Sequence, residues 1–329
     1  MNAHTRFLVG FDGTSVPSEL RAFLAAGSPA GVVLFGRNIV STEQVAELTA
    51  DLAALWPADG PPPLICVDQE GGPVQRLKPP QCPEFDRVPA MRDIVATHDL
   101  VAIEALGARM GSQLAATGFN VDFAPVLDVD TNPANPIIAE RAFGTTPAEV
   151  AERALAFARG LSRGGVLGCG KHFPGHGDTA LDSHLALPVV AHDRARLEAI
   201  ELPPFRAAVA ADIPMLMTAH ILMPALDPIW PATLSPRIIP ELLRAQWGYD
   251  GVVVSDDLEM KAVFDRYSVD EIAHGCVDAD VDVLLVCRDL AYATELSAAV
   301  AAYQTDGQRQ RAERRIRTLR DRAATLRVW

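Results

Sequence analysis

The stretch from Lys171 to His184 is the densest cluster of side chains that could do chemistry. It reads KHFPGHGDTALDSH and holds three of the eight histidines in the chain. Asp182 and His184 stand two residues apart, where a carboxylate can orient an imidazole and raise its basicity. The glycines and the proline of the stretch allow tight turns and a movable loop. We therefore interpret Asp182 and His184 as a general acid/base pair; the alternative is an ordinary hydrogen-bonded histidine in a surface loop.

A second candidate for chemistry is Asp256, which follows directly after the run Val252–Ser255. A strand ending at this point would hold the aspartate rigidly. The attacking oxygen of a nucleophile has to be fixed relative to the carbon that it attacks, so this placement suits a nucleophile. Together with a separate proton donor, such an aspartate indicates cleavage of a glycosidic bond.

Two other chemistries fit the same residues less well. A metal-dependent hydrolase would carry its ligands after successive strands, as four residues do here: Lys171, His172, His220 and Asp256. However, metal-dependent hydrolases that are built as barrels carry a histidine pair after the first strand, and this sequence has Phe11–Gly13 there. No HExxH cluster occurs either. A serine nucleophile would need a G-x-S-x-G turn, which the sequence lacks. We therefore expect neither a metal nor another cofactor.

Eight short apolar runs, rich in β-branched residues, recur along the chain, and each is followed by a longer helical pattern. Runs of this kind suit strands that are buried on both faces of a parallel sheet. Eight alternations predict an α/β protein with a single (β/α)8 TIM-type barrel over residues 1–329; a doubly wound open sheet is the alternative. The expected strands are Phe7–Phe11, Gly31–Phe35, Leu64–Val67, Val121–Leu127, Val166–Gly170, Met215–Thr218, Gly251–Val254 and Val281–Val286.

Ionisable residues stand just past each expected strand. Asp68 follows the third strand, Lys171 and His172 follow the fifth, and Asp256 follows the seventh. In a barrel of this type the carboxyl ends of the strands meet on one face, and that face carries the chemistry. The sequence therefore predicts that these side chains lie together.

Helical patterns between the runs include several start signals. Ser41 is one, and Thr146 followed by Pro147 is another. Asp130 and Asp289 also stand in loops after strands, and we interpret them as helix caps or solvated loop charges. The expected helices are Thr42–Leu55, Leu100–Thr117, Pro147–Arg163, His192–Ala211, Pro236–Gln246 and Leu290–Tyr303.

The arginine-rich segment Gln308–Leu326 fits either a nucleic-acid-binding tail or a terminal amphipathic helix. Its apolar residues fall on one helical face, namely Ile316, Leu319, Ala323 and Leu326. The whole chain has 29 Lys and Arg residues against 42 Asp and Glu residues, a formal net charge of −13. Nucleic-acid binding needs a basic face, so the acidic balance favours the helix and excludes nucleic acid as a partner of the whole chain.

Composition also bears on the compartment. No apolar stretch reaches the roughly 18 residues of a membrane span, and the acidic charge argues against an anionic membrane surface. The five cysteines are scattered without a CxxC pair, which is typical of reduced thiols. The first apolar run is too short for the core of a signal peptide. We expect a cytoplasmic protein.

Five motifs occur in a fixed order between roughly Phe7 and Arg288. They are Val67–Gly72, Phe123–Asp128, Glu140–Arg141 with Phe143–Gly144, Lys171–Gly177 with Asp182–His184, and Ser255–Met260. In these motifs the chain resembles the bacterial β-N-acetylhexosaminidases of glycoside hydrolase family 3, especially the short type with a single domain. One departure is Ala139, where the family often has glycine.

The resemblance implies roles for eight residues. Asp256 would be the nucleophile that forms a covalent glycosyl-enzyme, and His184, held by Asp182, would be the general acid/base. An imidazole titrates near neutral pH, and its uncharged form repels an anionic nucleophile less than a second carboxylate would. The residues that would bind the hydroxyls and the acetamido group of the terminal sugar are Asp68, Arg76, Arg141, Lys171 and His172.

The resemblance further implies a retaining exo-β-N-acetylglucosaminidase that removes terminal N-acetylglucosamine from peptidoglycan muropeptide fragments. Its partner would be a small carbohydrate, with no nucleic acid, membrane, metal or cofactor involved, and we expect a monomer. Two alternatives remain open. One is a phosphorylase of the same family, in which phosphate replaces water, and the other is a sugar-binding barrel without catalytic activity.

Overall fold

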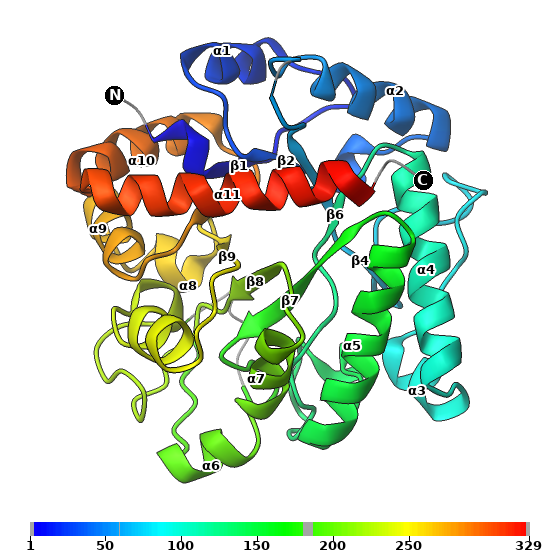
Figure 1. Cartoon of the computed structure of the whole chain (residues 1–329), viewed down its shortest axis with the longest axis vertical. Helices are drawn as coiled ribbons and strands as arrows, with labels where there is room; N and C mark the ends of the chain where they lie inside the picture. The colour runs from blue at the N-terminus through cyan, green and yellow to red at the C-terminus, as the bar shows by residue number, and fades with distance from the viewer. Residues whose placement is uncertain (1–2, 59, 180–186, 327–329) are drawn as a thin grey trace.

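The computed structural model describes residues 3–58, 60–179 and 187–326. Within them, parallel strands close into a barrel in the order β1-β10-β9-β8-β7-β6-β3-β2 (Figure 1). Pairing of β1 with both β2 and β10 completes the ring, which confirms the expected (β/α)8 barrel. The strands are β1 Phe7–Val9, β2 Gly31–Leu34, β3 Leu64–Val67, β4 Gln69–Gly71, β5 Val74–Gln75, β6 Val121–Asp122, β7 Leu167–Phe173, β8 Met215–Thr218, β9 Val252–Asp257 and β10 Val283–Val286.

Helices surround the barrel. Among the described residues, no helix combines the length and the apolar character that crossing a membrane requires. The α-helices are α1 Ser18–Ala26, α2 Thr42–Ala53, α3 Met91–Thr97, α4 Leu100–Ala116, α5 Pro147–Arg163, α6 Arg194–Ala199, α7 Pro203–Ala210, α8 Lys261–Phe264, α9 Val269–Asp278, α10 Leu290–Tyr303 and α11 Asp306–Leu326. Short 3-10 helices are η1 His4–Arg6, η2 Gly36–Asn38, η3 Ala139–Arg141 and η4 Ala232–Leu234, and η5 Ile238–Gln246 is a π-helix.

The helix start signals are confirmed, whereas one expected helix is wrong. The side-chain oxygens of Ser41 and Thr146 each accept the backbone N–H three residues further on, at the starts of α2 and α5. The single helix expected over 192–211 is instead two helices, α6 and α7. Pro203 and Pro204 lack the N–H that a helix interior needs, so they stand in the first turn of a new helix.

Of the two loop carboxylates, Asp289 has the capping role expected of it, whereas Asp130 is neither a helix cap nor a solvated charge, because its side chain is only 8% exposed. Asp289 caps α10, and its Oδ1 accepts the backbone N–H groups of Ala291 at 2.8 Å and Tyr292 at 3.1 Å. Asp130 forms an ion pair with Arg92. Neither carboxylate faces the chemistry described below.

The antiparallel hairpin of β4 and β5 is not among the expected elements. Gly71 and Gly72 make its turn with φ angles of 104° and 55°, a region that glycine enters without steric cost. A Cβ atom added to Gly71 would lie 2.8 Å from Cγ1 of Val88, so space also requires glycine there. The hairpin follows β3 directly and carries Glu70 on β4, and Arg76 comes just after β5.

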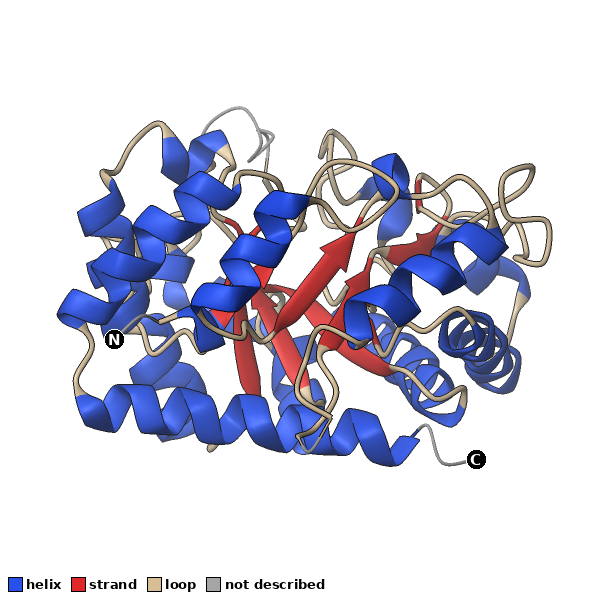
Figure 2. Cartoon of the chain, turned by 90° about the horizontal axis from the view of Figure 1, so that it is seen from above, coloured by secondary structure: helices blue, strands red, loops and turns tan. Residues whose placement is uncertain are grey.

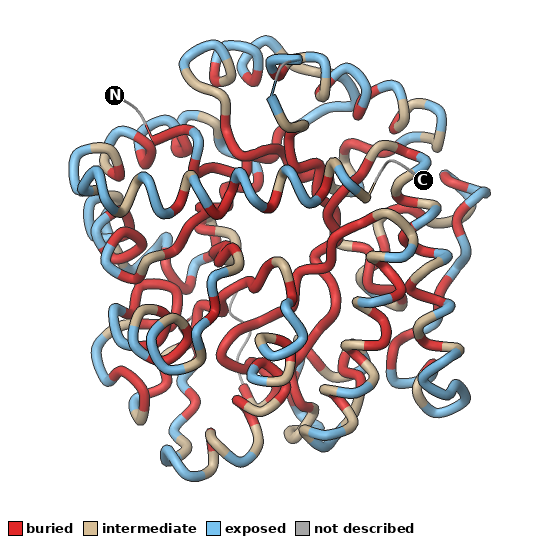
Figure 3. The backbone as a smooth tube through the Cα atoms, in the orientation of Figure 1, coloured by how far each residue is buried: buried red, intermediate tan, exposed pale blue. Residues whose placement is uncertain are grey.

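The interior of the barrel is an apolar core that α11 closes from below. Inward-facing residues of the barrel strands form one cluster with Ile316, Leu319 and Ala323 of α11, and Leu326 packs against it. The strand arrows point away from α11, so this helix covers the amino ends of the strands (Figure 2). Buried backbone is concentrated in the barrel and on the inner sides of the helices (Figure 3). The expected amphipathic helix is confirmed.

Arg315, whose side chain is 7% exposed, fastens α11 to the barrel through three carboxylates, of which Asp282 is buried and Asp250 is largely exposed. Its guanidinium lies 2.8 Å from Asp250, 2.9 Å from Asp280 and 3.0 Å from Asp282. Asp282, which is also buried, lies 2.6 Å from Arg244. Removing one member of such a group leaves the others buried without full compensation.

We predict that Arg315→Leu lowers the free energy of unfolding by about 3–5 kcal/mol, because Asp282 and Asp280 lose a buried cation. Chemical denaturation measures this loss. The matched control is Arg311→Leu on the same helix, whose half-exposed side chain lies 3.4 Å from Asp280. An exposed pair contributes about 1 kcal/mol or less. Equal small losses in both variants would contradict the fastening role of Arg315.

Candidate active site

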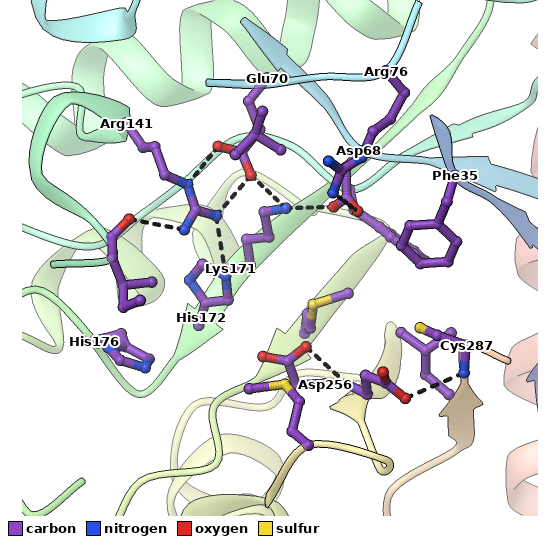
Figure 4. Close-up of a pocket in the computed structure, with 17 residues that line it drawn as sticks. Phe35, Asp68, Glu70, Arg76, Arg141, Lys171, His172, His176, Asp256 and Cys287 are labelled. Atoms are coloured by element: carbon purple, nitrogen blue, oxygen red, sulfur yellow. Dashed lines mark hydrogen bonds and ion pairs between the residues drawn. The ribbon is translucent and has the colours of Figure 1, made fainter. Parts of the chain in front are cut away.

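A cavity opens at the carboxyl ends of the barrel strands, and Figure 4 shows the side chains that line it. These strand ends point away from α11 (Figure 2). Side chains from the ends of β2 to β10 and from the loops that follow them line the cavity. Six of the eight residues predicted from the sequence line this one cavity: Asp68, Arg76, Arg141, Lys171, His172 and Asp256. Asp182 and His184 lie outside the described residues, so their placement stays a prediction.

Alternating charges form a continuous row along one wall of the cavity. Lys171 lies between two carboxylates, with its Nζ 2.8 Å from Asp68 Oδ1 and 2.6 Å from Glu70 Oε1. Arg141 makes a bidentate contact with Glu70, because its Nε and Nη2 each donate at 2.8 Å. Arg76 completes the row, with Nη2 3.3 Å from Asp68 Oδ2. The row ties β7, the β4–β5 hairpin and η3 together.

The pairing keeps these buried groups ionised. Burial by itself would raise the pKa of Asp68, but Lys171 and Arg76 outweigh it and hold that pKa well below its ordinary value. Burial likewise opposes ionisation of Glu70, yet Arg141 and Lys171 lower its pKa to about 2. Burial would lower the pKa of Lys171, but Asp68 and Glu70 raise it. All of them are therefore charged at neutral pH, and each has a partner, as buried charges require.

Asp128, after β6, is a fully buried carboxylate that holds His172 and the turn beyond it. Its Oδ2 lies 2.7 Å from Nδ1 of His172, and its Oδ1 accepts the backbone N–H of His176 at 2.6 Å. Burial opposes ionisation of Asp128, but His172 and the hydrogen bonds that it receives keep its pKa lowered. On the far side of the ring, Nε2 of His172 lies 3.5 Å from Nη2 of Arg141. The imidazole is thus held at Nδ1 by Asp128, and the guanidinium of Arg141 faces its other ring nitrogen.

Asp256 and Asp257 end β9. Asp256 lies on the side of the cavity that faces the row of charges (Figure 4). Oδ1 of Asp256 accepts the backbone N–H of Asp257 at 2.8 Å, which orients the carboxylate. None of the described lysines or arginines forms an ion pair with Asp256. Asp257 accepts the backbone N–H groups of Cys287 and Glu259, and burial followed by nearby carboxylates raises its pKa to about 7.

His220, considered above as a metal ligand, has both ring nitrogens in contact with protein. Nδ1 lies 2.8 Å from Oγ1 of Thr233, and Nε2 lies 2.9 Å from the carbonyl oxygen of Asp257. In the described ranges, no group of three or more His, Cys, Asp and Glu side chains is arranged to hold a metal ion. The observed contacts give His220 a structural role under the Asp256 strand.

Three residues of the site are not among those predicted, although they stand in the quoted motifs: Glu70, Asp128 and His176. Glu70 follows Asp68 by two residues, and side chains at this spacing in an extended chain point to the same side. This signal could have found it. His176 lines the cavity, and burial, then the neighbouring His172, lower its pKa to about 4, so it is neutral at pH 7.

Comparison with known sequences identifies the family. Residues 9–319 match the family described as Glycosyl hydrolase family 3 N terminal domain. A β-hexosaminidase from Alkalilimnicola ehrlichii is 40% identical over 287 residues, which are 85% of this chain and 80% of that protein.

Solved structures agree with the sequence match. A glycoside hydrolase family 3 β-N-acetylglucosaminidase from Paenibacillus sp. superposes with a TM-score of 0.92 at 38% identity, over 98% of this chain and 62% of that longer chain. NagZ from Neisseria gonorrhoeae, in complex with N-trifluoroacetyl-D-glucosamine, gives a TM-score of 0.77 at 31% identity, over 96% of this chain and 98% of that one. The chain therefore belongs to glycoside hydrolase family 3 and is a glycosidase.

Proposed function

We propose that this glycosidase is a retaining exo-β-N-acetylglucosaminidase. The names of its relatives and the glucosamine derivative bound to the Neisseria enzyme support the sugar class. One observation supports the mechanism above the others. The carboxylates of Asp68, Glu70 and Asp128 each contact Lys, Arg or His, whereas Asp256 has no such partner among the described residues. A nucleophile needs an oxygen whose charge is not already held by a cation.

In the first step, Oδ2 of Asp256 attacks the anomeric carbon of the terminal sugar. The bond from that carbon to the glycosidic oxygen breaks, and a general acid gives its proton to the departing oxygen. We assign the proton donor to His184, oriented by Asp182, on the family resemblance. The products are a covalent glycosyl-enzyme and the free alcohol of the aglycone.

In the second step, His184 is neutral and takes a proton from water. The water oxygen bonds to the anomeric carbon, the ester bond to Asp256 breaks, and the carboxylate is restored with His184 protonated again. Two displacements at the same carbon invert it twice, so the sugar leaves with its original configuration.

The row of charges supplies recognition of the sugar. Lys171, Arg76 and Arg141 offer only hydrogen-bond donors, whereas Asp68 offers only acceptors. We assign these residues and His172 to the hydroxyls and the acetamido group. Because the ion pairs already hold most of these side chains in place, little ordering remains to be done when the sugar binds.

The proposal extends to the substrate and its setting. Muropeptide fragments of peptidoglycan are the source of terminal N-acetylglucosamine that the resemblance favours. The enzyme would be a cytoplasmic monomer built as one domain over 1–329, acting without metal or cofactor. All five cysteines are free and buried, which supports a reducing compartment. The family match over residues 9–319 supports a single domain.

We predict that Asp256→Asn lowers kcat on p-nitrophenyl β-N-acetylglucosaminide by about 10³-fold or more, because the covalent route is lost. The matched control is Asp257→Asn on the same strand. Its amide oxygen still accepts the N–H groups of Cys287 and Glu259, so we expect a loss of less than about 10-fold. Steady-state kinetics measure both. Comparable losses in the two variants would remove Asp256 from the nucleophile role.

Two additions to the same assay separate the remaining alternatives. We predict that a chelator leaves turnover by the wild type unchanged and that inorganic phosphate does not accelerate it. Acceleration with formation of a sugar phosphate would establish the phosphorylase. Inhibition by the chelator would indicate a metal hydrolase. A folded wild type without turnover that still binds N-acetylglucosamine would be the sugar-binding barrel.

We predict that His184→Ala lowers kcat/KM by about 100-fold or more on substrates with poor leaving groups. On p-nitrophenyl glycosides, whose leaving group needs little protonation, the loss of glycosylation rate is expected to be less than about 10-fold. A series of aryl glycosides with graded leaving-group pKa measures the difference. Equal losses across the series would show that His184 is not the proton donor.

A further inference from the structure

The surroundings of His172 determine which ring nitrogen carries its proton. Oδ2 of Asp128 lies 2.7 Å from Nδ1, and an ionised carboxylate only accepts hydrogen bonds, so Nδ1 is protonated. Nη2 of Arg141 lies 3.5 Å from Nε2, and a guanidinium only donates. Nε2 therefore carries no proton and presents a lone pair. The two neighbours, one a pure acceptor and one a pure donor, select the same tautomer.

The lone pair on Nε2 is available to a ligand because the contact with Arg141 is weak. A separation of 3.5 Å is beyond the ordinary range of a hydrogen bond. Arg141 is held mainly by Glu70, through two contacts of 2.8 Å, and by the carbonyl oxygen of Ile137 at 3.1 Å. Both Arg141 and His172 line the cavity, and Figure 4 shows their facing atoms joined across its wall.

A hydroxyl group fits between these two side chains better than any other sugar oxygen. It has one hydrogen to donate and lone pairs to accept with. Placed within reach of both, it would donate to Nε2 of His172 and accept from Arg141, so one weak contact would be replaced by two good ones. A carbonyl oxygen, a ring oxygen or a fluorine can accept but has nothing to donate.

We propose that Asp128 is a positioning residue that holds His172 as the Nδ1–H tautomer, so that His172 and Arg141 together select a sugar hydroxyl at this corner of the cavity. This inference rests on the proposed function and adds to it the identity of one contact. It assigns the acetamido carbonyl to another part of the site.

The variant Asp128→Asn inverts the tautomer with little change of shape. Oδ1 of Asp128 accepts the backbone N–H of His176 at 2.6 Å, and this short bond favours the oxygen of an asparagine at that place. The backbone N–H of His172 lies between the two carboxylate oxygens, 3.3 Å from Oδ1 and 3.2 Å from Oδ2. With the asparagine oxygen beside His176, its NH₂ group faces Nδ1 of His172. Nδ1 must then accept a hydrogen bond from this amide, so the proton of the ring moves to Nε2. Nε2 of His172 then presents a donor to the cavity instead of an acceptor.

The test compares p-nitrophenyl β-N-acetylglucosaminide with its 3-, 4- and 6-deoxyfluoro analogues. In the wild type, fluorine at one of these positions leaves Nε2 of His172 without its donor, and we expect kcat/KM to fall about 10- to 100-fold. In Asp128→Asn, the ratio of hydroxyl to fluoro substrate at that position is expected to shrink by at least about 10-fold, because the new N–H faces a fluorine that can only accept. No discriminating position, or an unchanged ratio in the variant, would overturn the proposal.

A control separates this effect from a general loosening of the site. Thr179→Val removes the contacts of the Thr179 hydroxyl with Nδ1 of His176 at 2.8 Å, with the His176 carbonyl oxygen at 3.1 Å and with Asn135 at 3.3 Å. It removes no contact of the Asp128 or His172 side chain. It is expected to lower kcat/KM for all four sugars by the same factor, so the ratio stays at the wild-type value. A shifted ratio in this control would show that the ratio reports loosening and would count against the proposal.

A measurement without substrate keeps the inference independent of turnover. Nitrogen-15 NMR distinguishes the two neutral tautomers of histidine, and a His172→Gln variant identifies the signal. We expect Nδ1–H in the wild type and, where the variant folds, Nε2–H in Asp128→Asn. Nε2–H in the wild type would overturn the inference. A wild type that shows Nδ1–H but does not turn over the parent sugar would instead refute the proposed function.

Discussion

The architecture of the site depends on the burial of Lys171 between two carboxylates. A charge can be removed from water only when it is paired, so Asp68 and Glu70 have to approach the Lys171 ammonium together. Their approach draws the β4–β5 hairpin against β7. Arg141 then has to approach Glu70 as well, because the single charge of Lys171 cannot balance the charges of both carboxylates. The cavity wall is therefore preorganised by the requirement of charge balance, before any sugar arrives.

Much of the fold and of the site could be predicted because the barrel imposes simple patterns. Its strands are buried on both faces, so each strand is a short apolar run, and a polar residue can stand only where a strand ends. The carboxyl ends of parallel strands share one face. Asp68, Lys171 and Asp256 could thus be placed together from their positions in the sequence alone, and the structure brings them to one cavity.

The pairing of the charges could not be predicted, since it depends on contacts between distant parts of the chain. Glu70 and Arg141 are 71 residues apart, and Lys171 and Asp68 are 103 residues apart. Nothing in the local pattern shows which carboxylate meets which cation. For the same reason the role of Asp128 beside His172 is absent from the sequence-based prediction. The two prolines at 203 and 204 indicate the start of a new helix from the local sequence alone. The prediction of one continuous helix instead follows the helical pattern on either side of them.

The closing of the barrel by α11 has a consequence for synthesis of the protein. This helix follows every barrel strand in the chain, so a ribosome makes it after all of them. Until it docks, the amino ends of the strands are open to water, and the apolar interior lacks Ile316, Leu319 and Ala323. In a nascent chain that stops before Asp306, no helix covers the amino ends of the strands. Exposed apolar surface of this kind is what chaperones and proteases recognise. The apolar interior of the barrel is thus completed only after α11, which follows every barrel strand in the chain, has been made and has docked.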